Sequence, residues 1–288
     1  MFALLTSVAW AFAVILFKRS GETVPPFALN FFRVGVSTIL FIPLMVFAWE
    51  PHWNDAPLRD YLILAASGVI AIAISDTLFH MCLNRVGAGI NAIIDCLYSP
   101  SVIFFAWLLI GERLSAWDLA GMCAVLAAIL IASRHKPPAG ATRRALTLGI
   151  VFGVFSMLTL GIGIVIAKPV LDRSPVIWAT AVRQIGTFIA MVPVALIAPS
   201  RRGIFSHFRP APSWRFMLPG TVLGSFLSLI FWIAGMKYTQ AGTAAILNQT
   251  STIHILVIAS IFLGEPLTRR KVGAAALAFV GIMIVIFL

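Results

Sequence analysis

Six ionisable residues lie inside long apolar stretches of this 288-residue chain. An ionisable side chain is costly at membrane depth, so each one must face a polar partner or water. Such residues are therefore candidates for binding a solute or carrying a proton. They are Arg33, Asp76, His80, Asp95, Arg183 and His254.

Arg33, Asp76 and Asp95 fall at one depth. Each lies six or seven residues from the same side of the apolar region, which is roughly 10 Å at the helical rise of 1.5 Å per residue. The sequence therefore predicts an intramembrane ion pair between Arg33 and one or both carboxylates. That pair either only neutralises a buried charge or belongs to a protonatable site, and both interpretations stay open at this point.

Polar residues recur at helical spacing around these acids. Asp76 and His80 are four residues apart and share a helical face, and Asn91, Asp95 and Tyr98 form a stripe at i, i+4 and i+7. A similar stripe later in the chain holds Asn248, Gln249 and Ser251. These residues either line a cavity or hold packed helices together through hydrogen bonds of roughly 0.6 kcal/mol each. We favour cavity lining for Asp95 and leave both roles open for the other stripe residues.

Three further residues are weaker candidates for a solute pathway. His254 stands alone on its apolar stretch, where a histidine more often belongs to the packed core than to a binding site. Trp10 and Trp232 fall where an aromatic wall around a solute would lie, although aromatic stripes are usually core packing.

Two Gly-Glu pairs, Gly111-Glu112 and Gly264-Glu265, each precede the last apolar stretch of one half of the chain. A carboxylate at this position favours the N-terminus of a helix. We therefore interpret both pairs as structural.

Composition and segment length set the fold class. Apolar residues make up 60% of the chain and charged residues 11%, and the mean hydropathy is +1.01. A soluble domain of this length needs far more polar surface, whereas a membrane-spanning helix needs about 20 apolar residues. Ten stretches fit that requirement: 2–17, 27–48, 61–81, 89–110, 117–133, 147–167, 176–198, 216–236, 242–263 and 272–288.

The chain repeats itself faintly at half its length. Arg33 recurs 150 residues later as Arg183, and the run Gly-Glu-Arg-Leu-Ser at 111–115 recurs 153 residues later as Gly-Glu-Pro-Leu-Thr at 264–268. Because each half holds five spans, an odd number, the two halves must be inverted relative to each other. Inverted repeats of this kind are typical of secondary transporters.

The sequence therefore predicts an all-α integral membrane protein of ten transmembrane helices in two inverted five-helix repeats. The first repeat covers residues 1–133 and the second covers 147–288, with a linker at 134–146. The ion pair predicted for Arg33 is not duplicated, because Asn248 and Leu229 stand 153 residues after Asp95 and Asp76. This difference between the repeats favours a functional role for the acids of the first half.

The distribution of basic residues among the loops predicts the membrane topology. Of the 21 Lys and Arg, fourteen fall in odd-numbered loops and five in even-numbered ones. The positive-inside rule then places the odd loops and the 134–146 linker in the cytoplasm and both termini outside. We expect the net charge of +11 to favour anionic membrane lipids rather than nucleic acid as a partner. Residues 2–17 are followed, not preceded, by Lys18-Arg19, which favours a retained first helix over a cleaved signal.

These features together resemble the EamA-type members of the drug/metabolite transporter superfamily. The resemblance rests on the two five-helix repeats, the Gly-Glu-x-Leu-Ser/Thr motifs, Arg33 and Arg183 in the second helix of each repeat, and the loops at 84–89 and 238–242. It covers essentially the whole chain. It implies a transporter of small organic solutes, usually an exporter, with a cavity between the halves lined mainly by helices 1, 3, 4, 6, 8 and 9. The superfamily handles amino acids, nucleotide sugars, drugs and other metabolites, so the solute stays open.

We therefore expect a secondary transporter, an exporter of a small organic solute such as an amino acid, metabolite or drug, in the cytoplasmic (inner) membrane. Enzyme signatures and a nucleotide-binding domain are missing from the sequence, so no catalytic residue, cofactor or metal site is predicted. The alternative is a membrane scaffold that uses the same fold without transport. The oligomeric state stays open, and a monomer is compatible with the sequence.

A proton-coupled mechanism would need a carboxylate that binds and releases a proton inside the membrane. Asp76 and Asp95 are the acids available there. We expect Asp95 to be the carrier, because the fourth helix should line the cavity and its counterpart Asn248 cannot ionise. Asp76 is then the fixed partner of Arg33.

Overall fold

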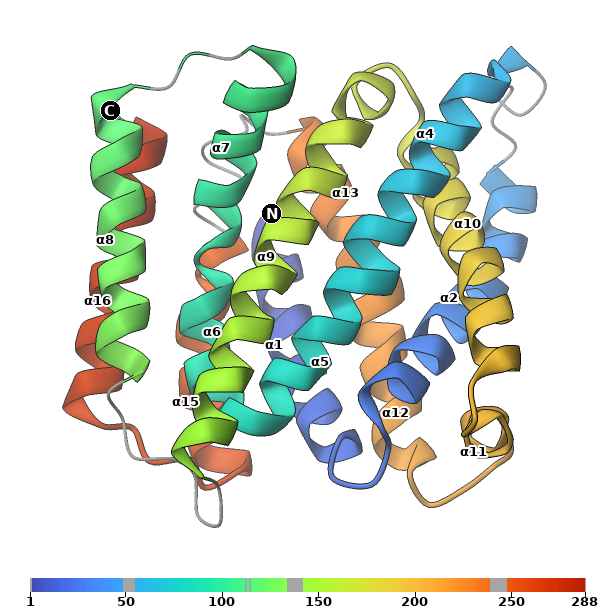
Figure 1. Cartoon of the computed structure of the whole chain (residues 1–288). Coiled ribbons are helices and arrows are strands. Elements are labelled where there is room, and N and C mark those ends of the chain that lie inside the picture. Colours follow the sequence, from blue (N-terminus) through green and yellow to red (C-terminus); the bar gives the residue numbers. More distant parts are fainter. Residues whose placement is uncertain are drawn as a thin grey trace.

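The chain folds into a bundle of helices that run between two ends (Figure 1). The computed structural model describes residues 2–48, 55–111, 113, 115–133, 142–238 and 248–287. Every regular element in these ranges is a helix, as expected for an all-α protein.

The first half of the chain contains helices that match the expected stretches. They are α1 (Phe2–Ser20), α2 (Pro26–Ala48), the continuous α4 (Leu58–Gly68), η1 (Val69–Ile74) and α5 (Ser75–Val86), then α6 (Ala88–Asp95), α7 (Tyr98–Ile110) and α8 (Ala116–Ser133). The stretch expected at 89–110 is two helices rather than one, because a turn at Cys96 and Leu97 separates α6 from α7.

The second half repeats this order. It contains α9 (Arg143–Leu171), α10 (Val176–Ile197), the short α11 (Arg201–Ser206), the continuous α12 (Trp214–Thr221), η2 (Val222–Leu227) and α13 (Ser228–Tyr238), then α15 (Ser251–Phe262) and α16 (Arg269–Phe287). Helix α9 begins four residues before the expected boundary at 147, so the last part of the expected linker is helical. Thr142 caps this helix by accepting a hydrogen bond from the backbone N–H of Ala145.

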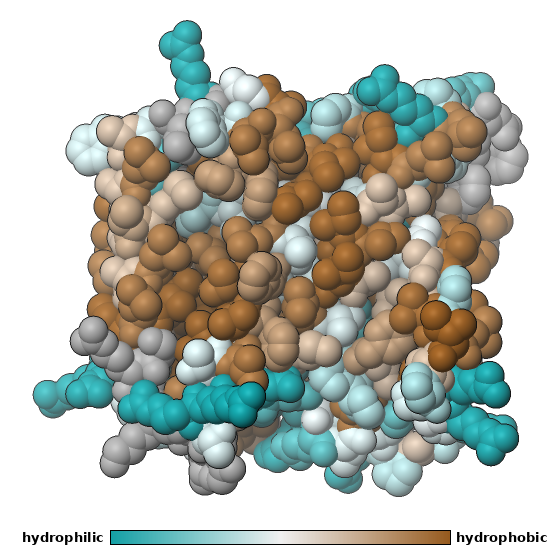
Figure 2. All heavy atoms as spheres, in the orientation of Figure 1, coloured by the Kyte–Doolittle hydropathy of each residue, from teal (hydrophilic) through white to brown (hydrophobic). Residues whose placement is uncertain are grey.

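Six helical stretches in the described ranges are long and apolar enough to cross a membrane. They are Pro26–Phe47, Leu58–Val86, Ala88–Ile110, Arg143–Leu171, Val176–Ile197 and Trp214–Gly235. Two shorter apolar helices are Ala116–Ala132 and Ser251–Phe262. Figure 2 shows the matching surface, a broad hydrophobic band with hydrophilic residues gathered at the two ends. The chain is therefore a multi-pass membrane protein.

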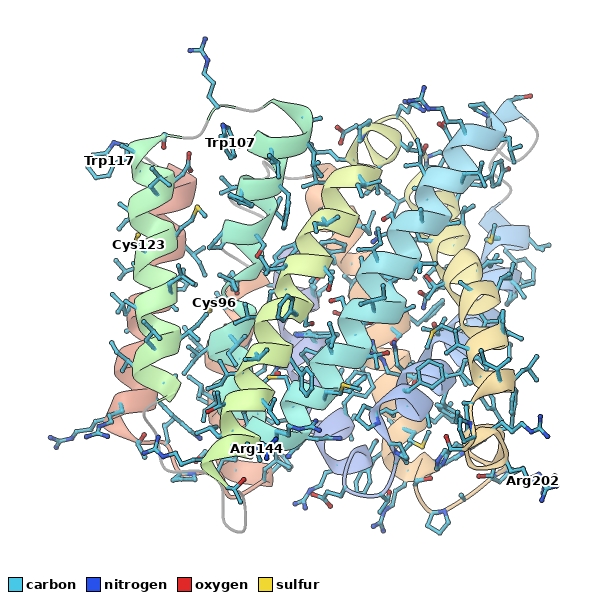
Figure 3. All side chains as sticks on the ribbon, viewed as in Figure 1. Cys96, Trp107, Trp117, Cys123, Arg144 and Arg202 are labelled. Atoms are coloured by element: carbon cyan, nitrogen blue, oxygen red, sulfur yellow. The ribbon has the colours of Figure 1, made fainter. Side chains whose placement is uncertain are left out.

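The two ends of the bundle carry different residues. Figure 3 places Arg144 and Arg202, from odd-numbered loops, at one end, and Trp107 and Trp117 at the opposite end. Tryptophan is typical of the membrane–water interface. These residues from two odd-numbered loops thus lie at the same face of the bundle.

The third membrane helix of each half contains a π-helix at the corresponding position. Residues Val69–Ile74 and Val222–Leu227 are 153 residues apart, the same offset that relates the Gly-Glu motifs. A π-helical turn is rare, and it often marks a functional site. In both halves the turn is followed directly by a buried serine, Ser75 or Ser228.

The last helices of the two halves, α8 and α16, lie side by side at one edge of the bundle (Figure 1). Glycine allows their close approach, because a Cβ atom on Gly281 would lie 2.8 Å from the carbonyl oxygen of Gly121. Helix α9 of the second half instead packs against α5 and α7 of the first half. There the hydroxyls of Ser75 and Ser156 each donate to the other residue's backbone carbonyl, at 2.8 Å in both directions.

Both glycines of the repeated Gly-Glu motifs adopt a left-handed backbone. Gly111 has φ 73° and Gly264 has φ 65°, and Gly111 ends α7 in the conformation that glycine adopts at least cost. Glu112 lies outside the described residues.

Glu265 caps a helix of the other half rather than α16, the helix that follows it in the chain. Its carboxylate accepts hydrogen bonds from the backbone N–H groups of Ala88 at 2.6 Å and Gly89 at 3.0 Å, at the start of α6. Lys271 completes the contact with an Nζ–Oε2 distance of 3.2 Å. Glu265 thus has the structural role at a helix N-terminus that the sequence predicts, but on α6 of the first half, because the chain between α15 and α16 carries it there.

Candidate functional site

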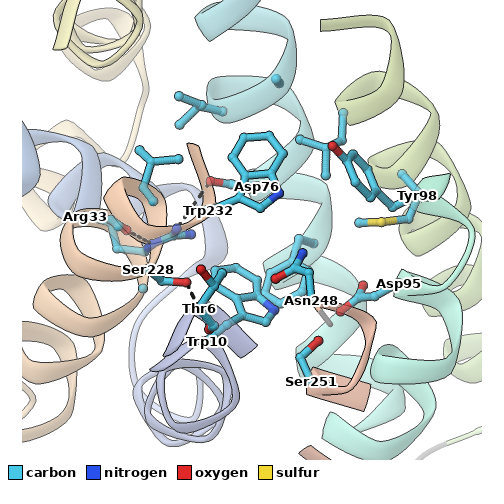
Figure 4. A pocket seen from close by; sticks show the side chains of 18 of the residues that line it. Thr6, Trp10, Arg33, Asp76, Asp95, Tyr98, Ser228, Trp232, Asn248 and Ser251 are labelled. Carbon is cyan, nitrogen blue, oxygen red and sulfur yellow. Dashed lines mark hydrogen bonds and ion pairs between the residues drawn. The ribbon is translucent and has the colours of Figure 1, made fainter. Parts of the chain in front are cut away.

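A cavity of about 170 Å³ lies between the two halves of the chain (Figure 4). Its charged lining residues are Arg33, Asp76, Asp95 and Arg183. Its aromatic lining residues are Trp10, Phe79, Tyr98 and Trp232. Hydroxyl and amide groups come from Thr6, Gln184, Ser225, Ser228, Asn248, Gln249 and Ser251. A buried cavity with aromatic walls and a few polar groups is the usual form of a small-molecule site.

Both halves contribute equivalent elements to the cavity. The lining comes from α1, α2, the third membrane helix and α6–α7 of the first half, and from α9, α10, the π-helix-containing helix and residues 248–251 of the second. The outer pair α8 and α16 supplies none of the lining residues. The family resemblance implies lining mainly by helices 1, 3 and 4 of each repeat. The second helix of each repeat, α2 and α10, joins them through its arginine.

Arg33 on α2 is surrounded by partners. Its guanidinium donates from Nε to Ser225 Oγ at 2.9 Å and forms an ion pair with Asp76, with an Nη2–Oδ2 distance of 3.3 Å. Its Nη1 lies 2.7 Å from Nε2 of His80, and its Cζ lies 4.4 Å from the centroid of the Phe17 ring. All three nitrogens and one face of this 3% exposed side chain are therefore engaged.

His80 lies behind Arg33 and does not line the cavity. Because an arginine side chain only donates hydrogen bonds, Nε2 of His80 must act as the acceptor. The imidazole is then neutral, with its proton on Nδ1, an atom that has no hydrogen-bond partner in the described structure. His80 therefore positions Arg33 rather than facing a solute.

Asp95 ends α6 on the other side of the cavity. It accepts hydrogen bonds from Nδ2 of Asn91 at 3.1 and 3.3 Å. Within the described ranges Asp95 has no cationic partner, in contrast to Asp76. In Figure 4 it lies beside Asn248 and Ser251, away from Arg33. The predicted pair of Arg33 with one or both acids therefore forms with Asp76, the acid expected as its fixed partner, and Asp95 takes no part in it.

Arg183 on α10 lines the same cavity with different surroundings. The side chain is 3% exposed. It forms no ion pair and no side-chain hydrogen bond with a described residue, and its Nε atom is buried without a partner. The carboxylate of Asp76, which pairs directly with Arg33, attracts Arg183 only through space, without a direct ion pair.

Aromatic rings form the wall between the two charged sides. Trp10 and Phe79 have ring centroids 5.5 Å apart, and Tyr98 and Trp232 have centroids 6.2 Å apart in an edge-to-face arrangement. Figure 4 shows Trp10 and Trp232 between the Arg33 side and the Asp95 side. Both tryptophans line the cavity rather than packing only in the core.

Two other sequence-predicted residues lie away from the cavity. Asn91 is fully buried, and its side-chain amide donates a hydrogen bond to the Asp95 carboxylate. The Nδ1 atom of His254 lies 3.5 Å from the Ser7 hydroxyl and takes no part in the lining.

The comparisons with known proteins identify the family. The model of the EamA-like transporter family matches residues 1–134 and 147–287. The chain belongs to the EamA-like transporter family. The resemblance inferred from the motifs is thereby confirmed.

Relatives of this EamA family member carry transporter names. Two proteins of Archaeoglobus fulgidus, each named an uncharacterized transporter, are 22% and 20% identical, and the alignments cover 99% and 98% of this chain and 97% and 96% of theirs. The uncharacterized transporter YvbV of Bacillus subtilis is 22% identical over 87% of this chain and 80% of its own. A crystal structure of another protein superimposes with a TM-score of 0.67 at 15% identity, over 98% of this chain and 94% of that one, and so shares the fold. This EamA family member is accordingly a membrane transporter.

Sequence reasoning did not select several small polar residues of the cavity. Thr6, Ser225 and Gln184 line it, and Ser225 binds Arg33 directly. The hydroxyl of Ser228 donates to the backbone carbonyl of Thr6 at 3.4 Å. A usable signal existed for Ser228, because it recurs 153 residues after Ser75. For Ser225 the signal was missing, because its counterpart at that offset is Ile72.

Proposed function

We propose that this protein is a secondary transporter that exports a small organic solute across the cytoplasmic membrane. The observation that carries the proposal is the cavity shared by both halves, which is lined by two buried arginines, two aspartates and an aromatic wall. Charged groups at membrane depth are costly and are retained where they serve a pathway. A cavity of about 150 Å³ can hold benzene, so a volume of about 170 Å³ suits a solute of the size of a small amino acid or metabolite.

The architecture that we propose for this transporter is ten spans in two inverted repeats, 1–133 and 147–288, with a cytoplasmic linker at 134–146. Two matched features support it. The π-helices and the left-handed glycines Gly111 and Gly264 each recur at an offset of 153 residues. Repeats of opposite orientation around a midplane site are the usual basis of alternating access.

We further propose that export is driven by proton entry, with Asp95 as the proton carrier. Asp76 is engaged by Arg33, whereas Asp95 faces the cavity and contacts the amide of Asn91. An amide can donate to a carboxylate and accept from a carboxylic acid, so both protonation states of Asp95 keep a partner. The counterpart Asn248 has no titratable group, so one carrier per transporter is expected.

Flux into proteoliposomes tests the transport function. The full chain is reconstituted with an imposed proton gradient, and uptake of a panel of amino acids, organic acids, organic cations and drugs is compared with protein-free vesicles. Protein-dependent movement of at least one solute is expected. Absence of movement across the whole panel contradicts the proposal.

Asp95→Asn tests the coupling. The variant should lose proton-driven accumulation while it still exchanges solute down its gradient, because the cavity keeps its shape and loses only the titratable group. Asp172→Asn is the matched control, since Asp172 is an exposed acid at the even-loop end that pairs with Lys168. Uphill transport by the Asp95→Asn variant would exclude Asp95 as the carrier.

Single cysteines test the proposed topology. In a background without Cys82, Cys96 and Cys123, a cysteine at Thr142 should be shielded from an impermeant thiol reagent in whole cells, and one at Trp117 should react. The reverse pattern would invert the orientation.

A further inference from the structure

Arg33 and Arg183 occupy matching positions in the second helix of each half, but only Arg33 is saturated with partners. Its hydrogen bonds go to Ser225, Asp76 and His80, and its guanidinium stacks on Phe17. One of these partners, Ser225, comes from the π-helix of the opposite half. The environment of Arg33 is therefore complete without any solute.

The corresponding positions around Arg183 are apolar. The counterparts of the four partners are Ile72 for Ser225, Leu229 for Asp76, Ile233 for His80 and Ala167 for Phe17. Each polar or aromatic group that engages the first arginine is replaced by an aliphatic one at the second. Arg183 keeps its charge, while the side chains at these four positions offer it no hydrogen-bond acceptor.

The structure shows the consequence of these replacements. Arg183 lines the cavity and is 3% exposed, yet its Nε atom is buried without a hydrogen-bond partner and its side chain forms no ion pair with a described residue. Removing a charged group from water without a partner is strongly unfavourable. Within the described residues no side chain forms an ion pair or a hydrogen bond with the Arg183 guanidinium, so contacts in that part of the chain do not account for this cost.

We propose that Arg183 binds an anionic group of the transported solute, and that the solute class is therefore organic carboxylates. This proposal rests on the proposed transport function. The guanidinium presents its N–H groups in a planar fork that matches a carboxylate through two parallel hydrogen bonds. The aromatic wall of Trp10, Tyr98 and Trp232 provides apolar contact for the rest of the molecule. Asp95 lies on the far side of the cavity, away from Arg33 and Asp76 (Figure 4).

Acid and amide pairs of the same shape test the assignment. The purified full chain is heated in detergent with phenylacetate or phenylacetamide, and with propionate or propionamide. We expect the acids to raise the midpoint of thermal unfolding and the amides to leave it unchanged, because only the acids offer a charge to Arg183. Stabilisation by the amides as strong as that by the acids, or no stabilisation by either acid, overturns the proposal.

Two substitutions locate the effect. Arg183→Gln should weaken binding of the acid about 10- to 100-fold, the loss expected for a charge-assisted hydrogen-bonded pair, and Arg183→Lys should recover part of it. Arg202→Gln, which removes an exposed arginine at one end of the bundle, should bind like the unmodified protein. An Arg183→Gln variant that is stabilised by the acid as much as the unmodified protein overturns the proposal. If Arg183→Gln fails to fold, the Lys variant and the acid–amide comparison on the unmodified chain still decide the matter.

Flux distinguishes failure of this inference from failure of the transport function. Protein-dependent flux of neutral or cationic solutes without flux of acids leaves the transporter in place and removes the carboxylate assignment. A chain that moves no solute at all refutes the transport function itself. Flux of phenylacetate that Arg183→Gln abolishes supports both.

Discussion

Glu265 should contribute more to stability than any other glutamate in the described part of the chain. Its carboxylate accepts two backbone hydrogen bonds from the start of α6 and pairs with Lys271, and the two side chains are 18% and 6% exposed. Glu265→Gln replaces one acceptor oxygen with an NH2 group. One backbone N–H then faces a donor, at a cost of roughly 1–3 kcal/mol, and Lys271 loses its countercharge in a largely buried place.

Together these losses amount to about 3–4 kcal/mol for Glu265→Gln, with values at or slightly below the lower end of each range because Glu265 is partly exposed. For a chain of this size the midpoint of thermal unfolding should fall by about 6–15 °C. Unfolding in detergent, followed by circular dichroism, measures it. Glu22→Gln is the matched control, because Glu22 pairs with Arg19 in an ion pair whose side chains are 52% and 41% exposed, and such pairs contribute about 0–1 kcal/mol.

A refuting result is a Glu265→Gln midpoint no lower than that of Glu22→Gln. A second measurement separates the two losses. If the contact with Lys271 matters, Lys271→Met should destabilise the unmodified protein more than it destabilises the Glu265→Gln variant. Equal effects in both backgrounds would mean that the backbone bonds to Ala88 and Gly89 account for the whole cost.

Three further predictions concern stability and use the same unfolding measurement. Asp76→Asn should cost about 3 kcal/mol, because it leaves the buried charge of Arg33 uncompensated, whereas the exposed Asp172→Asn should cost under about 1 kcal/mol; equal midpoints for the two would be inconsistent with a buried pair. Gly264→Ala should cost about 1 kcal/mol through its left-handed backbone alone, since nothing lies within 4 Å of the added Cβ; a far larger loss would point to a steric clash. Asn30→Leu should cost about 1–3 kcal/mol by leaving the carbonyl of Ile72 without its side-chain donor, whereas the carbonyl of Ala73 still accepts from the Thr77 hydroxyl; a neutral effect would mean that the Ile72 carbonyl is satisfied in another way.

Depth along a helix could be predicted from the sequence, because the rise per residue is constant. Counting residues therefore placed Arg33 and Asp76 at the same depth. In the structure Nη2 of Arg33 lies 3.3 Å from Oδ2 of Asp76. The same count gave Asp95 the same depth, but depth alone does not say which way a side chain points. Asp95 lies across the cavity from Arg33, and only the packing of α6 against its neighbours determines that.

The direction in which a side chain points around its helix axis was harder to predict from the sequence than its depth. Asn91 and Asp95 share a face, as their spacing predicts, yet Asn91 is fully buried and Asp95 reaches the cavity. A four-residue step moves along the helix as well as around it, so one residue of a stripe can face open space while the next faces packed side chains.

The cap that Glu265 places on α6 could not be predicted from the sequence for another reason. It joins residues 176 and 177 positions apart, and no local pattern encodes such a contact.

The third membrane helix of each half contains a π-helical turn that residue spacing does not reveal. Hydrogen bonds in a π-helix run from i to i+5, so each such turn holds one residue more than the α-helical pattern assumes. Every residue after η1, including Asp76, is therefore rotated relative to the residues before it, and a face drawn with a period of 3.6 across 61–81 does not continue through the turn. The side-chain amide of Asn30 donates to the carbonyls of Ile72 and Ala73 at 2.9 and 3.2 Å, at the end of this irregular turn. Arg33 lies one helical turn further along α2 and meets Asp76 there. Helix α2 therefore supports the irregular backbone and the buried charge together, which is a reason for Asp76 to hold its position beside the cavity.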